Sequence, residues 1–263
     1  MSAATNGTAF LRFKKIKGNG IITVAARHNR RELQAEMGAT DSIDPTHSQL
    51  NETLQGPSTA AGVGQLAKDL MAAAGVGMYR KPRKDAVSGI ELVFSLPPEH
   101  GINDRSFFID CAAWAGKWFG GVQNILSVDI HRDEAQCHCH VLILPLLPNG
   151  KMNASTLVGG PAQVRAMHEQ FHKVVASRYG FKKAPERLSG ARRAAAATAV
   201  LRSLAESSDP ALKSRAWSDF HHAIEADPAR FAMTLGIELK APVKRMRTMA
   251  AIFTSTGKGG NRE

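Results

Sequence analysis

Three histidines recur at close spacing in the segment HRDEAQCHCHV, which spans residues 131–141. The runs on either side of RDEAQC are strand-like, and side chains along a strand alternate between its two faces. His138 and His140 therefore share one face, and pairing of the two strands would bring His131 to the same face. Three neutral imidazoles at this spacing suit a divalent transition ion. The segment predicts a metal site, and the alternative is a polar strand edge.

Two acids and two cysteines lie in the same segment. Asp133 or Glu134 would add an oxygen ligand or orient a histidine through a hydrogen bond. Cys137 and Cys139 fall on the face opposite the histidines and lack the C-x2-4-C spacing of zinc sites, so we expect them to face a core. The third cysteine, Cys111, makes the number odd in a chain without a secretion signal, which favours reduced thiols over disulfides.

A second constellation surrounds His28. Its neighbours are Arg27, Asn29, Arg30 and Arg31. The stretch from residue 12 to residue 31 carries seven basic side chains and no acidic one, which is typical of segments that hold phosphates through charge-assisted hydrogen bonds. The alternative is a solvated, basic start of a helix.

The charge of the whole chain points in the same direction. Its 34 Lys and Arg residues exceed its 23 Asp and Glu residues, which gives a net charge of +11 and suits a polyanionic partner such as nucleic acid. An anionic membrane surface would also fit this charge. No apolar run approaches the roughly 18 residues of a membrane span, and the N-terminus lacks the order of a signal peptide. We therefore expect a cytoplasmic protein that does not enter the membrane.

Hydrophobic periodicity predicts the elements that position these residues. Residues 10–27 read as two short β segments around a Gly-Asn-Gly turn, because β-branched and aromatic residues flank positions that accept positive φ. Further strands are expected at 86–96, 124–131 and 138–146, and helices at 61–76, 104–121 and 161–181. Together they predict an α+β fold, in which an antiparallel β-sheet is flanked by helices.

The composition changes near residue 186. Beyond it Ala, Arg and Lys predominate, and no strand signal returns. A length of 263 residues allows a main domain plus a smaller one. The sequence therefore predicts a domain over residues 1–185, followed by a basic, Ala-rich helical extension over residues 186–263.

Four motifs resemble, in order, those of the Mob/Pre family of plasmid-mobilisation relaxases, also called plasmid recombination enzymes, which belong to the HUH endonucleases. The motifs are RHNRR at 27–31, DPTHSQLNETL at 44–54, RKDAVSGIELVFS at 83–95 and HRDEAQCHCHV at 131–141. The resemblance covers about residues 10–185, and its most specific part is the fourth motif, read as H-x-D-E-x3-H-x-H. It implies the HUH fold for this part of the chain.

The resemblance also implies a reaction. One DNA strand would be cut at a plasmid transfer origin, leaving the enzyme covalently attached to the 5′ phosphate, and transesterification would later reseal the nick. The attacking group of the family is thought to be the histidine of H-N-x-R, which maps to His28. The three HUH histidines, His131, His138 and His140, would hold a divalent ion, typically Mn²⁺ or Mg²⁺. Glu134 would assist as a further ligand or as a catalytic group.

Other implied roles concern the DNA. The positions expected to contact it are Arg27, Asn29, Arg30, Arg31, Asn51, Arg83 and Lys84. The expected partner is origin DNA, as a single strand and as a hairpin or duplex. A coupling protein, accessory factors and a second copy of the chain are further possible partners.

Alternatives and departures accompany the resemblance. Many HUH enzymes use a tyrosine on a helix after the metal motif, which makes Tyr179 the rival nucleophile to His28. Cys137 replaces a common Pro and His47 a common Arg, and the second change weakens the expected grip on phosphate. His28 must be neutral to attack, and we expect its neighbouring arginines to lower its pKa. A non-catalytic DNA-binding module and a metal-dependent phosphodiesterase that uses water are the competing functions.

Overall fold

The computed structural model describes residues 7–38, 42–77, 86–183, 185 and 188–239. The chain divides into two compact units, residues 1–184 and residues 185–263. Among the described residues, no helix has both the length and the apolar character needed to cross a membrane.

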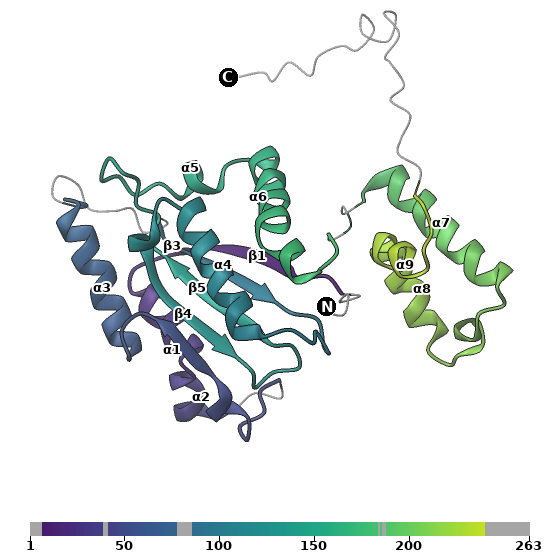
Figure 1. Cartoon of the computed structure of the whole chain (residues 1–263), viewed down its shortest axis with the longest axis horizontal. Helices are drawn as coiled ribbons and strands as arrows, with labels where there is room; N and C mark the ends of the chain where they lie inside the picture. Colours follow the sequence, from purple (N-terminus) through teal and green to yellow (C-terminus); the bar gives the residue numbers. More distant parts are fainter. Residues whose placement is uncertain (1–6, 39–41, 78–85, 184, 186–187, 240–263) are drawn as a thin grey trace, which may run out of the picture. The chain divides into compact units, whose positions relative to one another are not determined.

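The first unit is built around one five-stranded sheet (Figure 1). The strands are β1 (Phe10–Lys17), β2 (Glu52–Gln55), β3 (Val87–Ser95), β4 (Ile125–His131) and β5 (His138–Ile143). Their spatial order is β1-β3-β5-β4-β2, and every neighbouring pair is antiparallel. β1 and β2 are therefore the edge strands, and the histidine-bearing strands β4 and β5 lie inside the sheet.

Helices cover both faces of this sheet. One face packs against α4 (Asp104–Trp118) and α6 (Pro161–Val174) in the larger hydrophobic core. The other face packs against α1 (Ile21–Asn29) and α3 (Ala60–Ala73) in a smaller core. Because both faces are covered, β4 and β5 are buried along their whole length.

Short elements complete the first unit. They are α2 (Glu32–Met37), α5 (Ala154–Val158) and the 3-10 helices η1 (Ser48–Leu50), η2 (Val122–Asn124) and η3 (Ala176–Tyr179). Side-chain caps define two helix starts, since the oxygens of Thr59 and Asn103 accept hydrogen bonds from main-chain N–H groups in the first turns of α3 and α4. The predicted α+β fold, with an antiparallel sheet flanked by helices, is confirmed.

The predicted hairpin at residues 10–27 is wrong in its second half. β1 forms as expected, but the chain leaves the Gly-Asn-Gly turn through Gly20 at φ 69° and enters helix α1. The run Ile-Ile-Thr-Val favours a strand by local propensity. Its buried residues, however, are Ile22, Ala26 and Asn29, which recur at helical spacing, and burial against α3 overrides the local preference.

The register of β4 also differs from simple alternation. A bulge between Ile125 and Ser127 shifts the pairing with β5, so Leu126 packs in the smaller core while Val128 and Ile130 pack in the larger one. Strict alternation along a strand would have placed these three apolar residues on one face. Beside the bulge, Gly56 adopts φ 101°, and a Cβ atom there would clash with the main-chain oxygen of Leu126.

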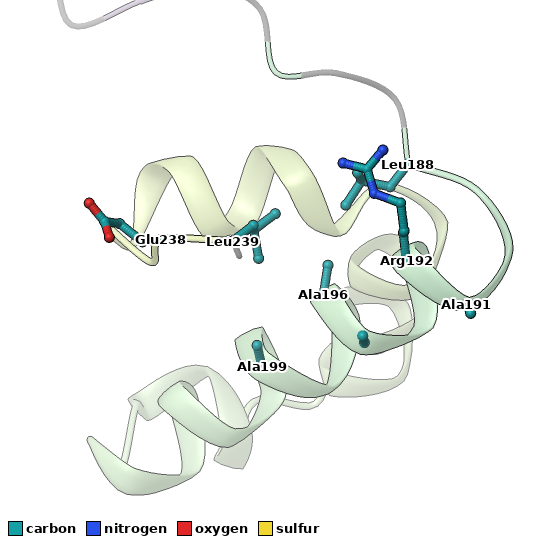
Figure 2. A pocket seen from close by; sticks show the side chains of 8 residues that line it. Leu188, Ala191, Arg192, Ala196, Ala199, Glu238 and Leu239 are labelled. Atoms are coloured by element: carbon teal, nitrogen blue, oxygen red, sulfur yellow. The ribbon is translucent and has the colours of Figure 1, made fainter. Parts of the chain in front are cut away.

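The second unit is helical in the part that the structure describes. It consists of α7 (Gly190–Glu206), η4 (Pro210–Lys213), α8 (Trp217–Ala226) and α9 (Pro228–Thr234). Its small core joins one face of α7 to α8 and α9. A groove of about 480 Å³ lies between α7 and the segment after α9, lined by alanines of α7 and by Leu188, Arg192, Glu238 and Leu239 (Figure 2). No residue of the histidine cluster lines it.

Candidate active site

Three histidine rings meet on the face of the sheet that α1 covers. His131 ends β4 and pairs in register with His138 of β5, and His140 lies two residues further along β5. The ring centroids are 4.7 to 5.0 Å apart, and all three side chains are buried. Each ring offers a nitrogen, and these atoms lie within 4.8 Å of one another. The expected convergence of the three imidazoles is present.

Each imidazole has one nitrogen committed to an oxygen acceptor. The pairs are His131 Nε2 with the main-chain oxygen of Asn29 at 2.6 Å, His138 Nδ1 with that of Gln136 at 2.8 Å, and His140 Nδ1 with Glu91 Oε1 at 2.9 Å. Carbonyl and carboxylate oxygens only accept, so these nitrogens carry the protons. The other nitrogen of each ring, Nδ1 of His131 and Nε2 of His138 and His140, is left with a lone pair. The first two of these atoms lie 3.2 Å apart, which suits a pair of nitrogens facing one ion.

The protonation of the rings fits the same role. Burial, with added repulsion from His140, lowers the pKa of His131 to about 2. Burial likewise lowers the pKa of His138. Neutral imidazoles are the form that binds metal ions. The donor set and its tautomers therefore fit a divalent transition ion.

Asp133 does not point a free oxygen at the histidines. Its carboxylate accepts hydrogen bonds from Arg31 Nε at 2.9 Å, Ser48 Oγ at 2.8 Å and Asn51 Nδ2 at 2.7 Å. Burial alone would raise the pKa of Asp133, but the bonds from Arg31, Asn51 and Ser48 lower it to about 2. Asp133 therefore ties the segment around η1 and the end of α1 to the metal motif.

Glu134 lies closer to the ligand nitrogens. Its Oε1 atom is 3.9 Å from His138 Nε2 and accepts a hydrogen bond from Arg31 at 2.8 Å. Its side chain is 27% exposed, so the carboxylate reaches the rim of the cluster. Of the two acids in the motif, Glu134 is the one placed to assist at the site.

His28 lies beside the cluster, in the last turn of α1. Its ring centroid is 6.0 Å from that of His140 and 6.4 Å from that of His131. Its pKa is lowered by burial first, then by repulsion from His140 and Arg31. The sequence had attributed this shift to neighbouring arginines, but desolvation is the larger cause because α1 packs onto the sheet.

Gln34 holds the other side of the His28 ring. The amide Nε2 atom of Gln34 lies 3.1 Å from His28 Nδ1. Arg31 adopts the left-handed conformation, with φ 58°, between the two helices, and this turns α2 back toward α1. Nothing in the sequence pattern singled out Gln34.

The arginines around His28 point to carboxylates. Arg27 pairs with Glu36, and Arg30 lies 3.1 Å from Asp129 with both side chains buried. Together with the bond from Arg31 to Asp133, these pairs give each of the three arginines a carboxylate partner, with the Arg27–Glu36 pair at the surface. Their expected contacts with DNA stay a prediction.

The remaining expected DNA-contact positions divide into two groups. Asn29 is buried, with its amide 3.4 Å from Glu91 Oε1, and Asn51 also accepts the main-chain N–H of Arg132 at 2.7 Å. Both side chains therefore hold neighbouring groups of the site in place through hydrogen bonds. Arg83 and Lys84 lie outside the described residues.

Tyr179 lies on the opposite face of the sheet. Its ring packs against the larger core, edge-to-face with Phe107 at 5.1 Å, and its hydroxyl donates to Asp110 at 2.9 Å. Burial and the bond to Asp110 raise its pKa to about 12. The sheet separates this phenol from the histidine cluster.

His47 is also separate from the histidine cluster. It is exposed and lies 3.1 Å from Asp44, to which it pairs when protonated.

Glu91, by contrast, belongs to the site although sequence reasoning missed it. The sequence did contain an indication of this role. Glu91 is the one acid inside the apolar strand IELVF, and it shares a face with Val93, the register partner of His140.

The five-stranded antiparallel sheet with helices on both faces matches the fold of a relaxase domain. The chain belongs to the plasmid recombination enzyme family, Mob_Pre, whose pattern matches residues 5–189. A search of curated proteins found no similar sequence.

Solved structures share this fold. One is the Mn-bound MobM relaxase domain with 22 nucleotides of plasmid pMV158 oriT DNA and a 3′-thiophosphate, at 24% identity and a TM-score of 0.60 over 70% of this chain and 93% of that one. Another is the same domain with 26 nucleotides of oriT DNA, at 16% identity and a TM-score of 0.54 over 70% and 95% of the two chains. At these identities the likeness establishes the fold.

Proposed function

We propose that this chain is a relaxase, which nicks one DNA strand at a plasmid transfer origin and rejoins it through a covalent histidine intermediate. The observation that carries the proposal is the position of His28 beside three buried imidazoles whose free nitrogens converge. Family membership, the net charge of +11 and the oriT DNA bound to MobM support DNA as the substrate.

His131, His138 and His140 would hold the ion, with Glu134 beside them. A bound Mn²⁺ or Mg²⁺ would polarise the scissile phosphate and offset the charge on its oxygens. The MobM relaxase domain with 22 nucleotides of oriT DNA is Mn-bound. The hydrogen bonds that the three rings donate to the main-chain oxygens of Asn29 and Gln136 and to the carboxylate of Glu91 orient the rings before any ion arrives.

His28 would supply the nucleophile through Nε2, because Nδ1 is occupied by its contact with Gln34. The Nε2 lone pair attacks phosphorus, the N–P bond forms, and the bond from phosphorus to the 3′ oxygen breaks. The 3′ oxygen leaves with the electron pair and takes a proton from solvent. Burial keeps His28 neutral, which is the reactive form.

Gln34 would fix the tautomer that this attack requires. For Nε2 to be unprotonated, the proton must sit on Nδ1 and be accepted by the amide oxygen. That oxygen is buried without a hydrogen bond while the amide nitrogen faces His28. A half-turn of the amide exchanges the two atoms and brings the oxygen to Nδ1–H.

The test is the chemistry of the adduct. A labelled single strand carrying the cognate origin is incubated with the protein and Mn²⁺, and the covalent complex is isolated under denaturing conditions. A phosphohistidine bond is acid-labile and alkali-stable, so the adduct should disappear in mild acid. His28→Ala should bind the strand and form no adduct, whereas Tyr179→Phe should remain active.

Two outcomes would contradict the proposal. An acid-stable adduct that is lost in Tyr179→Phe and kept in His28→Ala would make the phenol the nucleophile. Cleavage without any adduct would indicate a phosphodiesterase that uses water. A non-catalytic DNA-binding module would cut nothing, and it offers no reason for the buried histidine cluster.

A further inference from the structure

The seven basic residues between positions 12 and 31 fall into two sets with different surroundings. The three near His28 are each paired with an acid, Arg30 and Arg31 inside the fold and Arg27 at the surface. The other four lie on β1: Arg12, Lys14, Lys15 and Lys17. Within the described part of the chain, no ion pair joins these four to a carboxylate. Their charge is therefore available to an outside partner.

The alternation of β1 sorts these four residues by face. Leu11 is buried in the larger core and Phe13 packs against it, so Phe10, Arg12 and Lys14 point to the opposite face. That face is the one with the histidines, because His140 shares it with Leu142 of the smaller core. All three of these β1 side chains are exposed, Phe10 to 37%.

Lys15 and Lys17 belong to the other face. Lys15 pairs in register with Ile90, which is buried in the larger core. After the irregularity at Ile16, Lys17 pairs with Val87, which packs against the same core. One strand therefore presents two positive charges on each side of the sheet.

The register places the first set in line with the cluster. Arg12 pairs with Val93, and Val93 pairs with His140. In the same way, Phe10 pairs with Ser95, and Ser95 pairs with His138. Neighbouring strands lie about 4.8 Å apart, so these β1 residues start roughly 10 Å from the histidines, across one intervening strand.

We propose that Phe10, Arg12 and Lys14 form a binding surface for the single DNA strand that runs from the scissile phosphate to the open edge of the sheet. Arg12 and Lys14 hold backbone phosphates, and Phe10 stacks on an unpaired base. This combination of basic side chains and an exposed ring is the chemistry that grips single strands without reading their sequence. The inference rests on the proposed function, because it places the cut at the histidines.

The stacking role selects a single strand over a duplex. A base in a duplex is already stacked on both sides, so Phe10 has no free base face to cover there. The two cations alone would attract either form of DNA. The assignment therefore predicts a preference for single strands that depends on Phe10.

The experiment measures binding of a fluorescent 25-nucleotide oligo(dT) to the full chain, without added metal, over a range of salt concentrations. Arg12→Ala with Lys14→Ala should reduce the slope of log affinity against log salt by about 1.4, since each phosphate contact contributes about 0.7. The matched double variant, Lys15→Ala with Lys17→Ala, removes the same charge from the other face and should leave the slope unchanged.

Phe10→Ala should weaken oligo(dT) binding roughly 5- to 100-fold at an unchanged salt slope, and Phe10→Trp should restore it. Equal slope changes in the two double variants would overturn the proposal, because the effect would then be overall charge. An equal loss for a 25-base-pair duplex in Phe10→Ala would overturn the single-strand assignment.

Two controls separate the possible failures. A thermal melt of each variant shows whether it is folded, and Arg12→Lys, which keeps the charge, should retain the wild-type slope. Failure of the proposed function would appear instead as absence of the covalent adduct in the wild-type chain. An unchanged slope in the Arg12 and Lys14 double variant, with the adduct present, would overturn the binding surface alone.

Discussion

Nδ1 of His140 lies 2.9 Å from Oε1 of Glu91, so a carboxylate on β3 fixes the orientation of a ring on β5. Burial would raise the pKa of Glu91, but the hydrogen bond from His140 lowers it. The ionised carboxylate accepts the Nδ1 proton and makes the opposite nitrogen a better ligand. The same oxygen lies 3.4 Å from the amide nitrogen of Asn29, which links α1 to the cluster.

Replacing Glu91 should therefore weaken the metal site without removing a ligand. We expect Glu91→Ala to lower Mn²⁺ affinity by about 10- to 100-fold, the usual effect of losing an oriented partner of a ligating histidine. Titration calorimetry with Mn²⁺ measures this. His28→Ala is the matched control and should keep wild-type affinity, whereas His140→Ala should lose binding. Equal affinities of Glu91→Ala and wild type would show that the ring needs no such partner.

Gln34 gives a prediction about rate and pH. Gln34→Met removes the acceptor and should slow adduct formation by up to about tenfold, the value of one hydrogen bond. Gln34→Glu keeps an acceptor and should retain activity. Its negative charge would also raise the pKa of His28, so the acidic limb of the pH–rate profile should move to higher pH.

The tautomer of His28 can be observed directly. Nitrogen-15 shifts of the imidazole should report a proton on Nδ1 in the wild-type chain and a mixture of tautomers in Gln34→Met. A proton found on Nε2 in the wild-type chain would contradict attack through that atom. A loss of rate in Gln34→Met with no tautomer change would assign Gln34 a packing role only.

Asp133 predicts how stability depends on pH. Its folded pKa of about 2 lies below its ordinary value of 3.8, so the ionised form stabilises the fold above pH 3.8 and this contribution is lost as the pH falls toward 2. The shift corresponds to about 2 kcal/mol. Asp133→Asn should therefore lower the free energy of unfolding at pH 7 by at least about that amount, since it also leaves Arg31 without its buried partner.

Urea unfolding at pH 7 and pH 3 tests this dependence. The difference between Asp133→Asn and wild type should narrow at the lower pH, because the unfolded wild-type chain takes up a proton at Asp133 there while the folded chain is still largely ionised at this site. Asp69→Asn, on the exposed side of α3, should change stability by less than about 0.5 kcal/mol at both values. A difference independent of pH would assign the effect of Asp133 to packing.

The cysteines should affect stability and leave the chemistry unchanged. Cys139 is fully buried in the larger core, and Cys139→Ser should cost about 1 to 3 kcal/mol because it buries a hydroxyl. Cys137 is only partly buried, with Sγ 3.4 Å from Asp104, so Cys137→Ser should cost less. Neither change should alter Mn²⁺ binding in calorimetry. Loss of Mn²⁺ in a folded variant would place a thiol at the metal.

The sequence was sufficient for the histidine cluster because strand alternation is a local rule. His138 and His140 share a face whatever else surrounds them, and antiparallel pairing through a short connection brings His131 beside them. The same rule predicted that Cys139 faces a core. Three of the four covering helices, α3, α4 and α6, and the two expected strands of the motif were also recognisable from periodicity, whereas α1 was not.

Contacts that depend on tertiary packing could not be predicted from the alternation of side chains along a strand. The segment after Gly20 becomes a helix because α3 buries it, although its residues favour a strand. The arginines of RHNRR pair with acids that lie up to 103 residues away in sequence, so the motif alone could not predict these pairs. Gln34 reaches His28 because Arg31 adopts a left-handed conformation. The spacing of residues in the sequence does not predict such a conformation.

Because of the bulge in β4, the number of residues that follow it decides which side chains face the histidine cluster. Leu126, inside the bulge, packs on the α1 side. From Ser127 onward the strand resumes alternation one step out of phase, which puts His131 on that same side. Substitutions at Val128 or Ile130 change only packing in the larger core. Insertion or deletion of a single residue between Ser127 and His131 would instead rotate the histidine into the hydrophobic layer and bring an aliphatic side chain to the cluster. The length of this short segment is therefore under a stricter constraint than its composition.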